Sequence, residues 1–100
     1  MNINVYKELD YPNADEQFVK AKLVSQVGDI IRGKNLTQAQ VAEATGLTQP
    51  QISNILRGRF RDISIEKLLR IATSLHHSVH IVIDQNPSEN ADISVELLAA

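Results

Sequence analysis

Apolar side chains recur at a helical period over most of this chain of 100 residues. Within residues 19–31 they stand three or four positions apart, a spacing that lines up one face of a helix. Asn13 is placed to cap this segment, and Gly33 and Asn35 can adopt the left-handed backbone that ends a helix. The pattern predicts a first helix of about 18 residues that extends to Arg32.

Three shorter helices are predicted after the first, each beginning at a hydroxyl residue. Thr37 and Thr48 each precede a glutamine by three positions, which is the capping-box spacing. Gly46 and Gly58 are placed to end these two helices. Ser64 begins the last helix, whose buried face carries Ile65, Leu68, Leu69, Ala72 and Leu75. The fold predicted up to residue 76 is therefore mainly α.

The hydrophobic period changes from helical to alternating after the last helix. The segment "SVHIVID" places Val79, Ile81 and Ile83 on one face of a short C-terminal β-strand. Residues 3–7 give a weaker strand signal. A lone strand leaves its backbone groups unpaired, so we expect it to pair with the same strand of a second copy in a homodimer. Pairing with the N-terminal segment is the alternative.

The formal net charge of -2 conceals two regions of opposite charge. Residues 32–61 hold five basic side chains and one acidic side chain, a local charge of +4. Residues 84–100 hold four acidic side chains and no basic one, a local charge of -4. A polyanion responds to the field of one face rather than to the total charge. The net charge therefore does not argue against nucleic acid as a partner.

Signals for catalysis, metal binding or export are sparse. The chain has no cysteine, glycine-rich phosphate loop or nucleophile motif, so we expect no enzyme activity and no cofactor. His76, His77 and His80 have no ligand spacing with nearby acids, which disfavours a metal site. No signal-peptide pattern and no apolar run near the ~20 residues of a membrane span occur, so we expect a cytoplasmic protein.

The two helices joined by "TGLT" carry the strongest functional signal. Small Ala42 allows close approach, Gly46 suits a tight turn, and the inward-facing positions are Val41, Leu47, Ile52 and Ile55. This is the spacing of a helix-turn-helix, which the residues from Gln38 to Arg57 match without a gap.

The stretch "LTQAQVAEATGLTQPQISNILRGR" resembles the Xre/Cro-type helix-turn-helix repressor domains. The resemblance implies a lambda-repressor-like bundle of four to five helices. In layout, with a leading helix, a further helix after the motif and a final strand, the chain is most similar to the antitoxin of type II toxin-antitoxin (HigA-like) pairs. The expected organisation is an N-terminal extension (1–14), a helix-turn-helix DNA-binding domain (15–76), a dimerisation strand (77–84) and an acidic tail (85–100), flexible or a short helix.

The resemblance also assigns roles to side chains of the second motif helix. It implies base contacts in the major groove for Gln49, Gln51, Ser53 and Asn54. Contacts with the DNA backbone are expected for Gln38, Thr48, Lys34, Arg57, Arg59 and Arg61. Two alternatives stay open, because Gln51 can instead complete a capping box and the arginines can form a solvated surface run. Pro50 departs from the pattern of the phage repressors in this family, which often have a polar, base-contacting side chain at this position.

The function implied is a sequence-specific repressor that binds a palindromic operator on double-stranded DNA as a homodimer. Proteins of the antitoxin layout also neutralise a small ribonuclease toxin and repress their own operon. The acidic tail, with Ile93, Val95, Leu97 and Leu98 as anchors, suits a small basic toxin protein, although a solvated disordered tail explains it equally well. A stand-alone Xre-type regulator with no toxin partner is the alternative.

Overall fold

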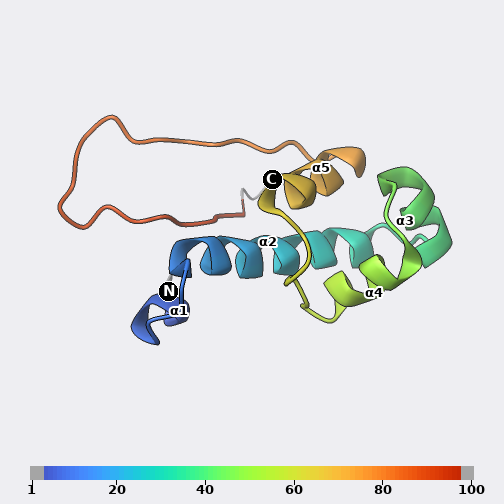
Figure 1. Cartoon of the computed structure of the whole chain (residues 1–100). Helices are drawn as coiled ribbons and strands as arrows, with labels where there is room; N and C mark the ends of the chain where they lie inside the picture. The colour runs from blue at the N-terminus through green and yellow to red at the C-terminus, as the bar shows by residue number, and fades with distance from the viewer. Residues whose placement is uncertain (1–3, 98–100) are drawn as a thin grey trace.

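The computed structural model describes residues 4–97, which contain five helices. They are α1 (Val5–Glu8), α2 (Ala14–Gly33), α3 (Gln38–Thr45), α4 (Gln49–Leu56) and α5 (Ile65–Ser74). The long α2 runs through the centre, α3 and α4 lie at its C-terminal end, and α5 packs along it (Figure 1). The predicted mainly α bundle is confirmed. No helix within residues 4–97 is long and apolar enough to cross a membrane.

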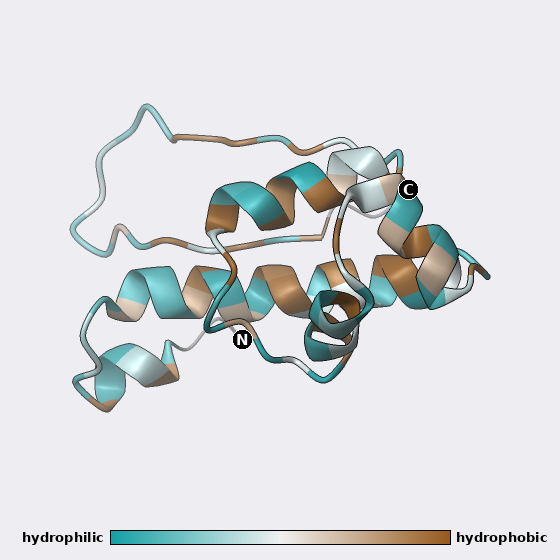
Figure 2. Ribbon diagram, turned by 45° about the vertical axis from the view of Figure 1, so that its right-hand side comes forward, coloured by the Kyte–Doolittle hydropathy of each residue, from teal (hydrophilic) through white to brown (hydrophobic). Residues whose placement is uncertain are grey.

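The core is the aliphatic interior between α2, the α3–α4 pair and α5. Val41, Ile52 and Leu68, one from each of three helices, are fully excluded from solvent. The apolar stretches of α2 and α5 are turned toward each other (Figure 2). The buried cluster consists of Val24, Val27, Ile31, Val41, Leu47, Ile52, Ile55, Leu68, Ile71 and Leu75. Burial of these aliphatic groups is the main driving force for the bundle.

The local signals for helix ends are largely confirmed. Thr37 and Thr48 each close a capping box with the glutamine three residues later. Ser64 caps α5 by accepting a hydrogen bond from the backbone N–H of Lys67 at 3.0 Å. Gly46 and Gly58 both have φ of 75°, a conformation in which a Cβ is strained. These signals are readable because each involves residues within one turn of the helix end.

The cap predicted at Asn13 is wrong in detail. Asn13 does stand at the N-terminus of α2, but its backbone is left-handed (φ 56°) and its side chain makes no capping hydrogen bond. A capping side chain needs an extended backbone at its own residue, which turns its oxygen toward the free N–H groups. The Asn4 amide contacts this end of α2 without capping its N–H groups, since it donates hydrogen bonds to the Ala14 carbonyl at 3.2 Å and to Asp15 Oδ1 at 3.3 Å.

The strand expected near residues 3–7 is also wrong over its described part, because Val5–Glu8 is helical. The Asn4 side chain caps this turn, and Tyr6 packs edge-to-face against Tyr11 and Phe60, with ring centroids 5.5 and 6.5 Å away. Ile3 lies outside the described residues. Local capping and an aromatic contact with a distant residue outweigh a weak alternation of three residues.

The C-terminal β-strand is not supported, and residues 4–97 contain no strand at all. Residues 77–97 form a long arm that leaves the end of α5, runs outward and returns toward α2 (Figure 1). Ile81, Val82 and Ile83 are 79%, 80% and 87% exposed. The physical reason is that a strand needs a neighbour, and the N-terminal segment that could have supplied one is helical. Residues 93–97 are not helical, and Leu98 lies outside the described residues.

Candidate nucleic-acid interface

The turn between α3 and α4 is fixed by hydrogen bonds as well as by packing. The Gly46 N–H donates to the Ala42 carbonyl at 2.8 Å and closes α3. The Thr45 hydroxyl, buried in the turn, donates to the Val41 carbonyl at 2.7 Å and accepts from the Leu47 N–H at 3.3 Å. Thr45 was missed by sequence reasoning, since a threonine one residue before a turn glycine gives no signal of its own. These contacts set the angle at which α4 leaves α3.

The N-terminus of α4 is closed by a reciprocal pair of side chains. The Gln51 N–H donates to Thr48 Oγ1 at 3.2 Å, and the Thr48 N–H donates to Gln51 Oε1 at 2.9 Å. Pro50 stands in the first turn, where its missing N–H leaves no bond unmade. Gln51 is therefore a capping residue in this structure. Its amide oxygen accepts the Thr48 N–H with one of its two lone pairs, and its Nε2 group makes no hydrogen bond within residues 4–97.

The candidate base-reading residues lie on the outer side of α4. Gln49, Gln51 and Asn54 are exposed, and Ser53 is half-buried. The opposite side carries Ile52 and Ile55, which are buried in the core. An amide on an exposed helix face can offer a donor and an acceptor together to an adenine edge in the major groove. The structure places these four residues on one short helix, and their contacts with bases stay a prediction.

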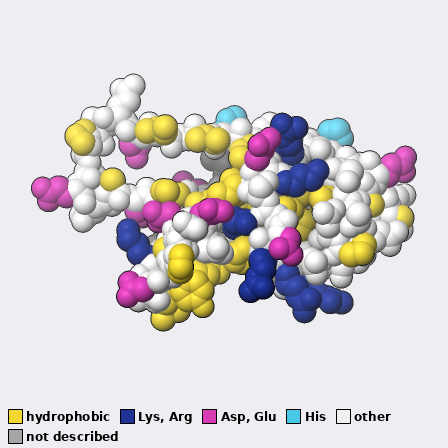
Figure 3. Space-filling model, in the orientation of Figure 1, with side chains coloured by type: hydrophobic (Ala, Val, Ile, Leu, Met, Phe, Trp, Pro, Cys, Tyr) yellow, Lys and Arg dark blue, Asp and Glu magenta, His cyan; other side chains and the backbone are white. Residues whose placement is uncertain are grey.

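The candidate backbone-contacting residues surround this helix. Arg57, Arg59 and Arg61 are exposed in the turn after α4, and no ion pair within residues 4–97 engages them. Figure 3 shows basic side chains gathered below the C-terminal end of α4. Thr48 and Gln38 stand at the N-termini of α4 and α3, and Lys34 follows α2. The backbone N–H groups at helix N-termini and arginine side chains without an ion-pair partner both favour the binding of phosphate groups.

The course of the arginine turn is set by its own hydrogen bonds. The Gly58 N–H donates to the Ile55 carbonyl at 2.9 Å and the Arg59 N–H to the Asn54 carbonyl at 2.8 Å. With the left-handed backbone at Gly58, this is a Schellman motif. The motif ends α4 and places Arg57 and Arg59 in the turn that directly follows it.

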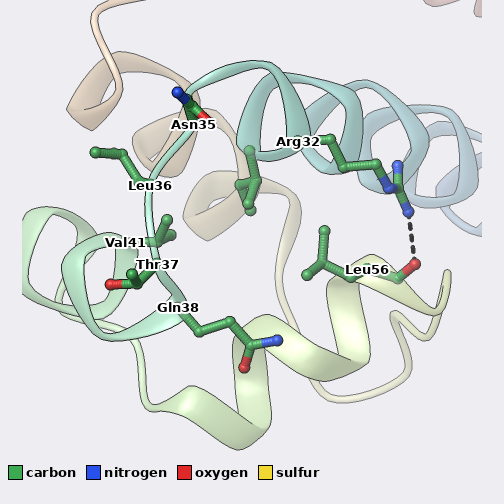
Figure 4. Close-up of a pocket in the computed structure, with 8 residues that line it drawn as sticks. Arg32, Asn35, Leu36, Thr37, Gln38, Val41 and Leu56 are labelled. Carbon is green, nitrogen blue, oxygen red and sulfur yellow. Dashed lines mark hydrogen bonds between the residues drawn. The ribbon is translucent and has the colours of Figure 1, made fainter.

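A hollow of about 390 Å³ lies between the end of α2, the start of α3 and the end of α4. Figure 4 shows Arg32, Gln38 and Leu56 among its lining residues, and a hydrogen bond joins the Arg32 guanidinium to the Leu56 carbonyl. No buried side-chain polar atom within the described residues lacks a partner.

The predicted dimerisation residues are all on the arm. The side chains are exposed to solvent, and no helix within residues 4–97 covers Val79, Ile81 or Ile83. His76, His77 and His80 are exposed as well, and no group of three or more metal-ligating side chains lies together within residues 4–97.

Comparisons with known proteins agree with this geometry. Residues 5–84 match a family described as a helix-turn-helix domain. The chain is 32% identical over 81 residues to protein P2 of Acyrthosiphon pisum secondary endosymbiont phage 1, a match that covers 74% of this chain and 86% of that protein.

A solved structure of an XRE family transcriptional regulator is similar in fold, with a TM-score of 0.75 and 29% sequence identity. The match covers 89% of this chain and the whole of that one. The family match spans the α3–α4 pair and the helices that pack on it. The chain therefore belongs to the helix-turn-helix domain family and is of the Xre type.

Proposed function

We propose that this protein is a transcriptional regulator that represses by occupying an operator on double-stranded DNA. The observation that carries the proposal is the short helix α4, fixed at its N-terminus by a capping box and exposing Gln49 and Asn54 beside an unpaired arginine turn. A rigid polar helix next to a basic segment has the two parts that sequence-specific binding needs. One part reads base edges and the other grips phosphates.

In this proposal α4 enters the major groove with its N-terminal end foremost. Gln49 and Asn54 read bases through their amides, Gln51 reads with an amide that the cap holds in place, and Ser53 has a lesser part. Arg57, Arg59 and Arg61 hold the flanking phosphates, together with Lys34 and the N-termini of α3 and α4 at Gln38 and Thr48.

The proposed assembly is a homodimer joined through Val79, Ile81 and Ile83. Supporting this, the segment is β-branched, exposed and part of no helix or strand, so its backbone groups and apolar side chains are both open to a partner. Pairing with the same segment of a second copy satisfies both edges by two-fold symmetry. The operator is then palindromic, with half-sites roughly 34 Å apart.

The test is the salt dependence of binding to a duplex that the wild-type protein selects from a random-sequence library. If each subunit neutralises ~4 phosphates, log K falls against log salt with a slope near -7. If the protein selects no duplex, or if the slope is near zero, the proposal is wrong. The helix-turn-helix would then be better explained as a protein-interaction module.

A second candidate function, the antitoxin of a toxin-antitoxin operon that represses its own promoter, is favoured by the arm. Its acidic residues Asp84, Glu89, Asp92 and Glu96 are all exposed and face no basic partner within residues 4–97. A small basic ribonuclease toxin has the complementary charge.

Co-purification decides between this role and that of a stand-alone regulator. The product of a neighbouring gene for a basic protein of ~100 residues is expressed with the full chain and with a chain ending at residue 83. Retention by the full chain alone supports the antitoxin. Retention by neither chain supports the stand-alone regulator.

A further inference from the structure

The C-terminal end of α4 depends on one side chain from another helix. The last four carbonyls of a helix have no partner within it and need donors from elsewhere. Here the carbonyls of Ser53, Asn54 and Ile55 accept from backbone N–H groups of the turn that follows. The Leu56 carbonyl accepts from Arg32 Nη2 at 2.7 Å, a short bond from a charged donor (Figure 4).

Arg32 is itself held in place on α2. Its Nη1 group lies 3.2 Å from Asp29 Oδ1, one turn earlier on the same helix. The guanidinium lies back over Gly28, where the Cβ of any larger residue would come within 3.1 Å of Nη1. Asp29 and the absence of a side chain at Gly28 together direct the second amino group of Arg32 toward α4. The longest helix of the bundle is thereby joined to the end of the helix proposed to read DNA.

We propose that Arg32 is a positioning residue for sequence recognition, an inference that rests on the proposed DNA-binding function. Since the Schellman turn and its three arginines begin where Leu56 ends, the Arg32 bond fixes both the tilt of α4 and the start of the basic turn. Base contacts require placement within about 0.5 Å, whereas phosphate contacts tolerate looser geometry. Losing the bond therefore lowers discrimination between sequences more than it lowers affinity for DNA in general.

The first test compares Arg32→Met with Arg70→Met on the selected duplex and on a random-sequence duplex. Both substitutions keep the stem and remove one positive charge. Arg70 is a matched control because it is paired with Glu66 of its own helix α5. We expect Arg32→Met to bind the selected duplex about tenfold more weakly than Arg70→Met does, with equal affinity for the random duplex.

Salt titration separates positioning from direct phosphate contact. A positioning residue leaves the salt slope of Arg32→Met equal to that of Arg70→Met. A phosphate contact reduces the slope by about 0.9 for each Arg32 lost and weakens both duplexes alike, which overturns the proposal. Arg32→Lys, which keeps the charge and a donor, should restore part of the sequence discrimination.

Asp29→Asn gives a second test, in which the affinity for DNA is expected to rise rather than fall. Because Asp29 is 77% exposed, its substitution should leave the fold intact, so the result does not depend on the stability of the Arg32 variants. Removing a negative charge tightens DNA binding by simple electrostatics. Glu66→Gln makes the same charge change on α5 and should tighten both duplexes equally.

Asp29→Asn should instead lower the ratio of selected to random affinity, because it frees Arg32. If Asp29→Asn and Glu66→Gln give the same ratio, the proposal is wrong. If the wild-type protein selects no duplex at all, the proposed function itself is wrong. That outcome is distinct from a failure of the Arg32 proposal alone.

Discussion

At the residue scale, the most informative side chain is Gln51, because one hydrogen bond restricts how its amide can turn toward a base. The Thr48 N–H takes one of the two lone pairs of Oε1 and holds the amide against the helix end, so Gln51 is less free than Gln49 to present its acceptor and donor together to an adenine. Gln49 has no such restraint in the described hydrogen bonds and is exposed. The spacing of Thr48 and Gln51 predicted the cap, the family resemblance implied a base contact, and the geometry shows that the cap is made.

Gln49→Ala should relax specificity at one base position at a cost of ~1–3 kcal/mol of binding free energy. Gln51→Ala should lower the free energy of unfolding through the lost cap and relax specificity less. Binding to a set of single-base operator variants, with thermal unfolding measured alongside, distinguishes them. Equal loss of specificity from both substitutions would show that the cap opens in the complex.

His76 has a backbone conformation that is unusual for a residue other than glycine, since its φ of 69° lies in the left-handed region. It ends α5 in the position where glycine is preferred, and the His77 N–H donates to the Ala72 carbonyl at 3.0 Å. His76→Gly should therefore raise the free energy of unfolding by about 0.5–1 kcal/mol, measured by urea denaturation. His77→Gly, which relieves no positive φ, should not; stabilisation by both would point to a different cause.

At the element scale, helix ends were predictable and long-range partners were not. The capping boxes at Thr37 and Thr48 and the glycine ends at Gly46 and Gly58 depend on neighbours within a few residues, so the sequence displays them directly. Helix α1 depends on the contact of Tyr6 with Phe60, which no local pattern reveals. The same holds for the link from Arg32 to Leu56.

Gly28 offers a way to separate stability from recognition at this scale. It lies inside α2, so Gly28→Ala should raise the free energy of unfolding by up to about 1 kcal/mol through helix propensity. The new methyl group presses on the Arg32 guanidinium. We expect a more stable protein that discriminates less well between duplexes. Higher stability with unchanged discrimination would show that Arg32 adjusts without moving α4.

At the scale of the whole molecule, the arginines beside α4 and the exposed apolar segment 79–83 lie on two different parts. The bundle carries the exposed arginines beside α4, and the arm carries exposed acids together with Ile81 and Ile83. The alternation of residues 79–83 suggested a strand, but pairing is a property of two segments, and residues 4–97 offer this one no partner. The dimer therefore stays a prediction for experiment.

Ile81→Lys should convert the proposed dimer to a monomer and lower operator affinity, with little change in the unfolding of the bundle, because Ile81 is 79% exposed. Sedimentation at several protein concentrations measures the association. Ile93→Lys is the control, since Ile93 is also exposed on the arm but lies outside the proposed strand. A dimer that survives Ile81→Lys would place the interface elsewhere.

The open course of the arm also has a consequence for turnover. Between residues 77 and 97 the backbone belongs to no helix or strand and nearly every side chain is exposed. A protease can engage such a segment without first unfolding the bundle. A single cut before residue 79 separates α4 from the segment proposed to join two copies. The lifetime of repression would then follow the rate of cleavage in the arm rather than the stability of the fold.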